Sequence, residues 1–255
     1  MDFGYAGKPI QTEQIAVNRR SASFRAGVFA PLPGTAAETQ AIGKILPTVN
    51  VLTGKQATES ALKQLNGPQI LHVATHGFFL PILPEQPMEE RSLQLADAGL
   101  LLQGPKTENP LLRSGLALAN ANQLESGGED GVLTALEATS LDLWGTKLVV
   151  LSACETGVGE VYIGEGVFGL RRALVIAGSE SQVMSLWKVD DLATKDLMVK
   201  YYRQLISNTG RSEALRQAQL AMLTDRKGSH PYYWASFIPS GDWTGLEIKA
   251  ISTQN

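Results

Sequence analysis

Two nearly all-apolar runs constrain the fold of this chain more than any other feature of its sequence. They are QILHVAT, residues 69–75, and KLVVLSA, residues 147–153. A strand that is apolar on both faces must be covered on both faces, and buried strands of parallel sheets have this pattern. Helical stretches alternate with these runs, which predicts right-handed crossovers between parallel strands. We therefore predict an α/β fold, a three-layer sandwich with a mostly parallel central sheet.

The remaining elements follow from periodicity and from turn and capping signals. Two capping boxes, Thr35 with Glu38 and Thr134 with Glu137, predict the starts of helices. Residues 77–129 contain five prolines at positions 81, 84, 87, 105 and 110, and we interpret them as a long insertion with a hairpin near SGLALANA. We expect one domain over residues 1–255, with helices at 36–46, 57–67, 134–143, 165–177, 192–207 and 212–224, and further strands at SFRAGVFA (23–30), VNVLTG (49–54), QVMSLW (182–187) and WASFIPSG (234–241).

Composition excludes several classes of protein. Of the 255 residues, 44% are apolar and 18% are charged, which is typical of a globular protein, and the net charge of −3 argues against direct nucleic-acid binding. A single cysteine cannot form an intrachain disulfide, so the fold does not depend on an oxidising compartment. No window has the roughly 18 apolar residues of a membrane span, and the first residues lack the pattern of a signal peptide. We expect a cytoplasmic protein without membrane contact.

Two of the predicted strands end in residues that carry chemistry. QILHVAT is followed by His76 and Gly77, and KLVVLSA is followed by Cys154. Functional groups gather beyond the carboxyl ends of parallel strands, and a thiol becomes a nucleophile when a nearby imidazole takes its proton. The amides of Gly77 and Cys154 are candidate donors to an oxyanion. The alternative is structural, because a lone buried cysteine often serves as a small apolar residue.

Other candidate sites are weaker. The loop after Cys154 contains Gly157, Gly159, Gly164 and Gly166, but its spacing fits neither dinucleotide-binding nor P-loop motifs. His72 is predicted to be a buried, hydrogen-bonded residue, and His230 a structural one. Neither C-x-x-C nor H-E-x-x-H spacing occurs, so we predict no metal site and no cofactor.

Several strings closely resemble the CHAT domain, a caspase-like module of bacteria that is often fused to tetratricopeptide repeats. They occur in the family's order between about residues 29 and 242: LHVATHGFF, SGLALANAN, GVLTALEATSLDLWGTKLVVLSACETGVGEV, GEGVFGLRRAL, SLWKVDD and HPYYWASF. The resemblance implies a caspase-hemoglobinase fold related to separases, with the motif histidine at His76 and the motif cysteine at Cys154. CHAT chains usually have a strand before the PLPGT segment, and DFGYAG resembles the segment immediately after that strand, so we expect a domain shortened at its N-terminus.

The resemblance also implies how a substrate is held. In caspase-like folds the peptide adds to the strand after the catalytic one, here QVMSLW, which makes Ser185 and Trp187 substrate-binding candidates. By similarity to separases, Asp190 or Asp191 faces a basic P1 side chain. Either aspartate is equally suited to capping the helix that comes next. An acidic P1 preference would need an arginine, and Arg171 and Arg172 are predicted to lie on a helix that faces elsewhere.

Our main hypothesis is a cysteine endopeptidase with a Cys154–His76 dyad that cleaves protein or peptide substrates after a basic residue. The alternative is a latent or non-catalytic CHAT module that serves interaction or regulation, with a regulatory partner or a tetratricopeptide-repeat domain. A third hypothesis is a Rossmann-like domain that binds a ligand on its glycine loop. The insertion at residues 77–129 fits a gate and an inert insertion equally well.

Overall fold

The fold is built on a four-stranded sheet. The computed structural model describes residues 29–46, 48–79, 109–123, 129–153, 160–162, 166–187, 189–225 and 228–248. The strand order is β1 (Ile70–Ala74), β5 (Leu148–Ser152), β8 (Ser181–Ser185) and β9 (Phe237–Gly241). The strands β1, β5 and β8 are parallel to one another, and β9 is antiparallel to β8. The mostly parallel sheet is therefore confirmed, with one antiparallel strand at its edge.

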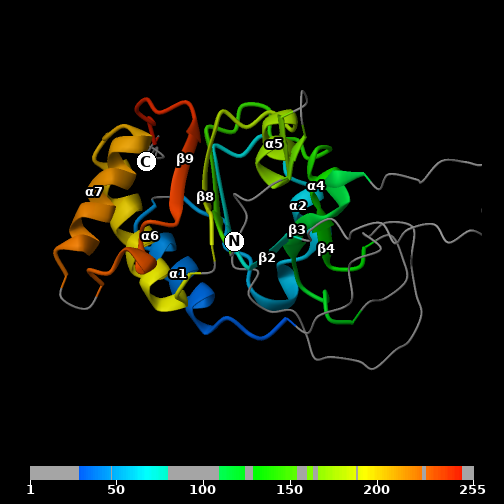
Figure 1. Cartoon of the computed structure of the whole chain (residues 1–255), viewed down its shortest axis with the longest axis horizontal. Helices are drawn as coiled ribbons and strands as arrows, with labels where there is room; N and C mark the ends of the chain where they lie inside the picture. Colours follow the sequence, from blue (N-terminus) through cyan, green and yellow to red (C-terminus); the bar gives the residue numbers. More distant parts are fainter. Residues whose placement is uncertain are drawn as a thin grey trace, which may run out of the picture.

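Helices cover both faces of this sheet, as the left and right sides of Figure 1 show. One face is covered by α1 (Pro33–Gly43), α6 (Asp191–Ile206) and α7 (Arg211–Leu223). The other is covered by α2 (Glu59–Lys63), α4 (Ala135–Ala138) and α5 (Leu170–Ile176). The three layers predicted from the sequence are confirmed.

The central strand β5 explains why its sequence is apolar throughout. Leu148 and Val150 pack with α6 and α7, whereas Val149 and Leu151 pack with α2, α4 and α5. All five residues of the strand are buried. Each of these aliphatic side chains contributes roughly 1.5–3 kcal/mol by leaving water, so both helical layers are held to the sheet through this strand.

The predicted insertion, residues 77–129, begins in a second sheet and contains its middle strand, and the third strand of that sheet follows it. This sheet consists of β2 (His76–Phe79), β3 (Ser114–Ala117) and β4 (Val132–Thr134), all antiparallel. Thr134 ends β4 and forms the predicted capping box with Glu137 at the start of α4. Residues 80–108 and 124–128 lie outside the described residues, so the gate stays a prediction. Leu116 and Leu133 join the same core cluster as Val149 of the central sheet. A single domain over residues 1–255 stays a prediction.

Several local predictions are wrong. VNVLTG is not a strand; the chain there lacks ladder pairing and ends in a 3-10 turn, Gly54–Gln56, where Gly54 has a φ of 53°. The first capping box does not form, because α1 already starts at Pro33, and Glu38 turns into the core. The helices predicted from 134 and from 165 are shorter, since α4 ends at Ala138 and residues 166–168 form β7, paired with β6 (Glu160–Tyr162). The strand predicted at 23–30 lies mostly outside the described residues.

Arg211 joins the last helix to the two strands beside it. Its guanidinium is 4% exposed and donates to the Lys147 carbonyl at 2.6 Å, to Ser181 Oγ at 3.1 Å and to Asp242 at 2.8 Å. Thr244 accepts two further bonds from it, one on its carbonyl and one on its hydroxyl. The side chain therefore satisfies polar atoms at the amino ends of β5 and β8.

We expect Arg211→Met to lower the free energy of unfolding by about 3 kcal/mol, because Asp242, Thr244, Ser181 and the Lys147 carbonyl each lose a bond from the buried guanidinium, although the Lys147 carbonyl keeps the Ser181 hydroxyl as a donor. Urea denaturation followed by circular dichroism measures this. Arg216→Met is the matched control, since Arg216 lies on the same helix, is exposed and bonds only Glu213 among the described contacts. Equal losses in the two variants would contradict the structural role of Arg211.

Candidate active site

The two predicted catalytic residues follow paired positions on neighbouring strands. Ala74 of β1 and Ser152 of β5 are direct partners in the parallel ladder, and the Thr75 N–H donates to the Ser152 carbonyl at 3.3 Å. His76 comes two residues after Ala74, and Cys154 two residues after Ser152. Cys154 itself lies outside the described residues. Because Ala74 and Ser152 are paired, the strands that precede His76 and Cys154 in the sequence end at the same edge of the sheet.

Thr75 turns the chain from the central sheet into the second sheet. Its N–H bonds to Ser152 of β5, and its hydroxyl donates to the Ala117 carbonyl of β3. The side chain is 1% exposed. This residue fixes His76 at the point where the two sheets diverge, and sequence reasoning missed it because a threonine at a strand end has many roles.

Residues 29–34, which run into the first two residues of α1, form an arm over His76. The Ala30 carbonyl lies 2.5 Å from His76 Nε2, and the Phe29 ring centroid is 5.4 Å from that of His76. A carbonyl oxygen only accepts hydrogen bonds, so Nε2 carries a proton and donates it to this contact. The arm therefore selects the Nε2–H tautomer of the neutral imidazole and leaves Nδ1 as its basic nitrogen.

Asn122 holds the arm in place. Its side-chain amide makes a two-point contact with Phe29, in which the Phe29 N–H donates to Oδ1 and Nδ2 donates to the Phe29 carbonyl, both at 2.9 Å. Asn122 is 6% exposed, and Phe29 also packs on the cluster that contains Ala117 and Val132. The SGLALANAN string thus supplies a strand and the residue that fixes the arm. The local sequence pattern predicts only the strand.

The two predicted substrate aspartates divide two capping roles. Asp190 caps its own helix, since Oδ1 accepts the N–H of Ala193 at 2.9 Å. Asp191 caps α1 instead: its Oδ2 accepts the N–H of Gly34 at 2.6 Å. Helix α1 has no side-chain cap of its own, and a Cβ at position 34 would lie 2.5 Å from Asp191 Cγ. Asp191 therefore links the start of α6 to the arm that holds His76.

The remaining predicted residues lie along β8 and β2. Ser185 is fully buried and donates to the Ala153 carbonyl, next to Cys154, so its hydroxyl holds the chain before the predicted nucleophile. Trp187 is exposed, and its indole N–H donates to the Tyr232 carbonyl at 3.5 Å. Gly77 lies opposite Leu116 in the second sheet.

The expectation that β8 offers a free edge to a substrate is wrong. All of its residues pair with β9, and the Leu186 N–H still bonds the Ser236 carbonyl at 3.0 Å. The antiparallel strand that closes the sheet occupies this edge. Any main-chain pairing by a substrate therefore has to begin beyond Leu186, at Trp187 and the residues after it.

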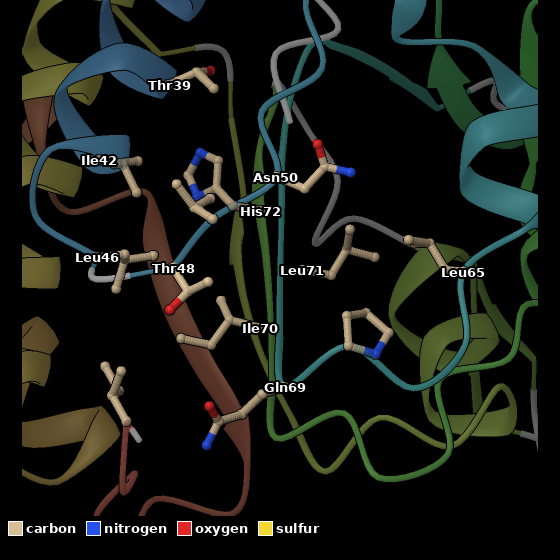
Figure 2. A pocket seen from close by; sticks show the side chains of 13 residues that line it. Thr39, Ile42, Leu46, Thr48, Asn50, Leu65, Gln69, Ile70, Leu71 and His72 are labelled. Carbon is tan, nitrogen blue, oxygen red and sulfur yellow. The ribbon is translucent and has the colours of Figure 1, made fainter. Parts of the chain in front are cut away.

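A cavity of about 410 Å³ lies away from this edge, along the open side of β1. Figure 2 shows Ile70 and Leu71 of β1 in its wall, with Asn50 from the segment wrongly predicted as a strand and Thr48 just before that segment. Its lining contains no charged residue and none of the predicted site residues. Its position beside a sheet edge explains the hollow better than ligand chemistry does.

The comparison with known protein families decides the classification. The family model for the CHAT domain matches residues 7–242. The chain belongs to the CHAT domain family. Its fold is accordingly the caspase-like α/β fold that the resemblance implied, and the central sheet with helices on both faces agrees with it.

Two curated relatives are similar over most of the chain. Tetratricopeptide repeat protein 28 from Mus musculus is 28% identical over 222 residues, and its Homo sapiens counterpart is 28% identical over 224 residues. Each alignment covers 84% of this CHAT chain but only 9% of the relative. Their names describe a repeat protein and mention no peptidase. They agree with the association of CHAT domains with tetratricopeptide repeats.

Membrane spans and metal clusters are both absent from the described part of the chain. Within it, no helix is both long and apolar enough to cross a membrane. The same residues contain no group of three or more histidine, cysteine, aspartate or glutamate side chains arranged to hold a metal ion. Of the glycines of the third hypothesis, Gly157, Gly159 and Gly164 lie outside the described residues, and Gly166 begins β7.

We expect Asn122→Ala to destabilise the protein by roughly 1–3 kcal/mol, because both Phe29 peptide groups lose a buried partner. The variant should also release His76 from the Ala30 carbonyl. Thermal unfolding measures the first effect, and ¹⁵N NMR of the His76 ring measures the second. A His76 ring that keeps its Nε2 proton and its chemical shifts would contradict the role of Asn122 in holding the arm.

Proposed function

We propose that this CHAT chain is a cysteine endopeptidase in which Cys154 is the nucleophile and His76 the base. The observation that carries the proposal is the contact of His76 Nε2 with the Ala30 carbonyl at 2.5 Å. A nucleophile needs a base, and the base needs a third group that orients it. The backbone carbonyl supplies that third group, so Nδ1 is the nitrogen available to the thiol.

The reaction follows from these roles. His76 Nδ1 takes the proton of the Cys154 thiol, and the thiolate sulfur attacks the scissile carbonyl carbon. The imidazolium then gives that proton to the leaving amine as the C–N bond breaks, which leaves a thioester on Cys154. Water, deprotonated by His76, attacks the thioester and releases the acid with the free thiol. The amides of Gly77 and Cys154 are the proposed donors to the oxyanion in both steps.

Asp191 is the better candidate for reading a basic P1 residue. Asp190 directs its carboxylate into the first turn of its own helix, whereas Asp191 reaches across to Gly34 in the arm over His76. A carboxylate has two oxygens, and the contact with Gly34 uses Oδ2, so Oδ1 is left to accept a guanidinium or an ammonium group. We propose that Trp187 and the residues after it hold the substrate main chain.

A non-catalytic interaction module is the second candidate, and the names of the relatives favour it. Both are called tetratricopeptide repeat proteins. In this alternative the domain binds a regulatory partner or a repeat domain, and the dyad is latent or unused.

The peptidase proposal has two further parts. The thiol of Cys154 has to be reduced, which fits a cytoplasmic location. We also propose a single domain over residues 1–255 that uses no cofactor.

Covalent labelling tests the peptidase proposal. We expect a peptidyl acyloxymethyl ketone with P1 arginine to modify Cys154, as measured by intact mass, and His76→Ala to slow the labelling at least about 100-fold because the base is lost. Iodoacetamide serves as the control for an accessible thiol. If iodoacetamide modifies Cys154 but no ketone with P1 arginine, leucine or aspartate does, the non-catalytic module is favoured.

The two aspartates form a matched pair for testing P1 choice. Asparagine keeps an acceptor for each capped amide, so both variants should retain their stability. We expect Asp191→Asn to lower the labelling efficiency with P1 arginine about 10- to 100-fold, because a charge-assisted contact between the carboxylate and the guanidinium is lost. Labelling with P1 leucine should be unchanged. Asp190→Asn should change neither. Equal effects of both variants on arginine and leucine probes would contradict the assignment of Asp191.

A further inference from the structure

A buried carboxylate, Glu38, lies at the junction of the helices and strands that carry the proposed site. It is 1% exposed. Its Oε2 accepts the Ser152 hydroxyl at 2.9 Å, and its Oε1 lies 3.0 Å from His72 Nε2. On the far side of the ring, His72 Nδ1 lies 3.0 Å from the Tyr202 hydroxyl. Ser152, His72 and Tyr202 are all buried as well.

The Tyr202 hydroxyl lies at the far end of this chain of contacts. Burial, with Tyr201 and the negative charge of Glu38 nearby, raises the pKa of Tyr202 well above its ordinary value, so its hydroxyl keeps its proton. The hydroxyl can then donate to Nδ1 of His72. Glu38 is held by the hydrogen bond from Ser152, and its Oε1 lies close to His72 Nε2 without the geometry of a hydrogen bond.

The four residues belong to the four elements on which the site depends. Glu38 lies on α1, whose first residues form the arm over His76, and Tyr202 lies on α6, which begins at Asp191. His72 is on β1, four residues before His76, and Ser152 is on β5, two residues before Cys154. Figure 2 shows His72 pointing from β1 toward the helix that carries Thr39 and Ile42. One carboxylate therefore contacts both catalytic strands from the helix that follows the arm.

We propose that Glu38 is a positioning residue of the proposed reaction, which fixes α1 against β1 and β5 so that the Ala30 carbonyl stays on His76 and His76 stays beside Cys154. The inference rests on the proposed peptidase function. A displacement of about 1 Å at a catalytic group can cost 100-fold in rate. Glu38 touches neither His76 nor Cys154 in the described contacts, so its effect passes through α1 and the two strands.

The test compares Glu38→Gln with a control of equal burial. Glu59 is also 1% exposed, but it lies on α2, across the sheet, where it bonds Lys63. Labelling by the P1 arginine ketone yields a maximal rate and a half-saturating concentration. We expect Glu38→Gln to lower the maximal rate about 10- to 100-fold with the half-saturating concentration within about twofold, and Glu59→Gln to change neither. A Glu38→Gln rate equal to that of the wild type, or an equal fall in both variants, overturns the proposal.

A second measurement separates this inference from the peptidase function. The chain has only three histidines, so ¹⁵N-histidine NMR resolves each ring. In the wild type, His76 should carry its proton on Nε2; Glu38→Gln should shift the His76 ring signals as well as those of His72. If the wild type is never labelled but the His76 signals still shift, the peptidase proposal fails and the positioning role stands. Unchanged His76 signals in Glu38→Gln overturn the positioning role.

Ser152→Ala keeps the test valid if Glu38→Gln does not fold. This substitution removes one hydroxyl from the network at little steric cost. We expect the maximal labelling rate to fall about 3- to 10-fold, less than in Glu38→Gln, because only one buried hydrogen bond is lost. Ser181→Ala is its control, because this serine also lies on a central strand and donates to the Lys147 carbonyl at the opposite end of the sheet. Equal rates in the two serine variants overturn the proposal.

Discussion

The parallel pairing of β1 with β5 is the constraint on which the rest of the structure depends. It places Ala74 opposite Ser152, and the Thr75–Ser152 hydrogen bond extends the pairing by one residue. Parallel strands cannot be joined by a tight turn, so the chain between them has to form a crossover. Here the crossover includes the second sheet and α4. It brings Ala74 and Ser152, which are 78 positions apart in the sequence, to the same edge of the central sheet. Both strands are apolar because that pair is covered on both faces.

The arm over His76 shows how one segment serves fold and site together. Residues 29–34 lead into α1, whose first turn lacks a side-chain cap from its own sequence. Asp191 supplies the acceptor from the start of α6, and Asn122 fixes the Phe29 peptide from the turn after β3. Unsatisfied amides at a helix start need partners, and the fold recruits them from distant elements. The Ala30 carbonyl is held against His76 as a consequence.

The sequence predicted the elements that have long uniform patterns and missed contacts between distant segments. Apolar runs predicted β1, β5 and β8, and helical periodicity predicted α6 and α7 within one residue at each end. The pattern of Thr134 and Glu137 predicted a capping box correctly, but the same pattern at Thr35 and Glu38 did not, because Glu38 pairs with Ser152, 114 residues away. A local motif cannot distinguish these outcomes, since the competing partner is chosen by the tertiary fold.

The same distinction between local patterns and distant contacts holds for the candidate site. Its strand-end residue His76 was predictable, because strand ends are local, and the capping role of Asp190 was one of two alternatives left open. The contacts of Ala30, Asn122 and Glu38 were not, since each joins segments separated by dozens of residues. A buried carboxyl group costs free energy unless hydrogen bonds compensate it, and Glu38 has the Ser152 hydroxyl as a donor and the His72 ring close by. A reaction that depends on the relative position of two strand ends gains from such a link between β1 and β5, and this is the reasoning behind the proposed positioning role of Glu38.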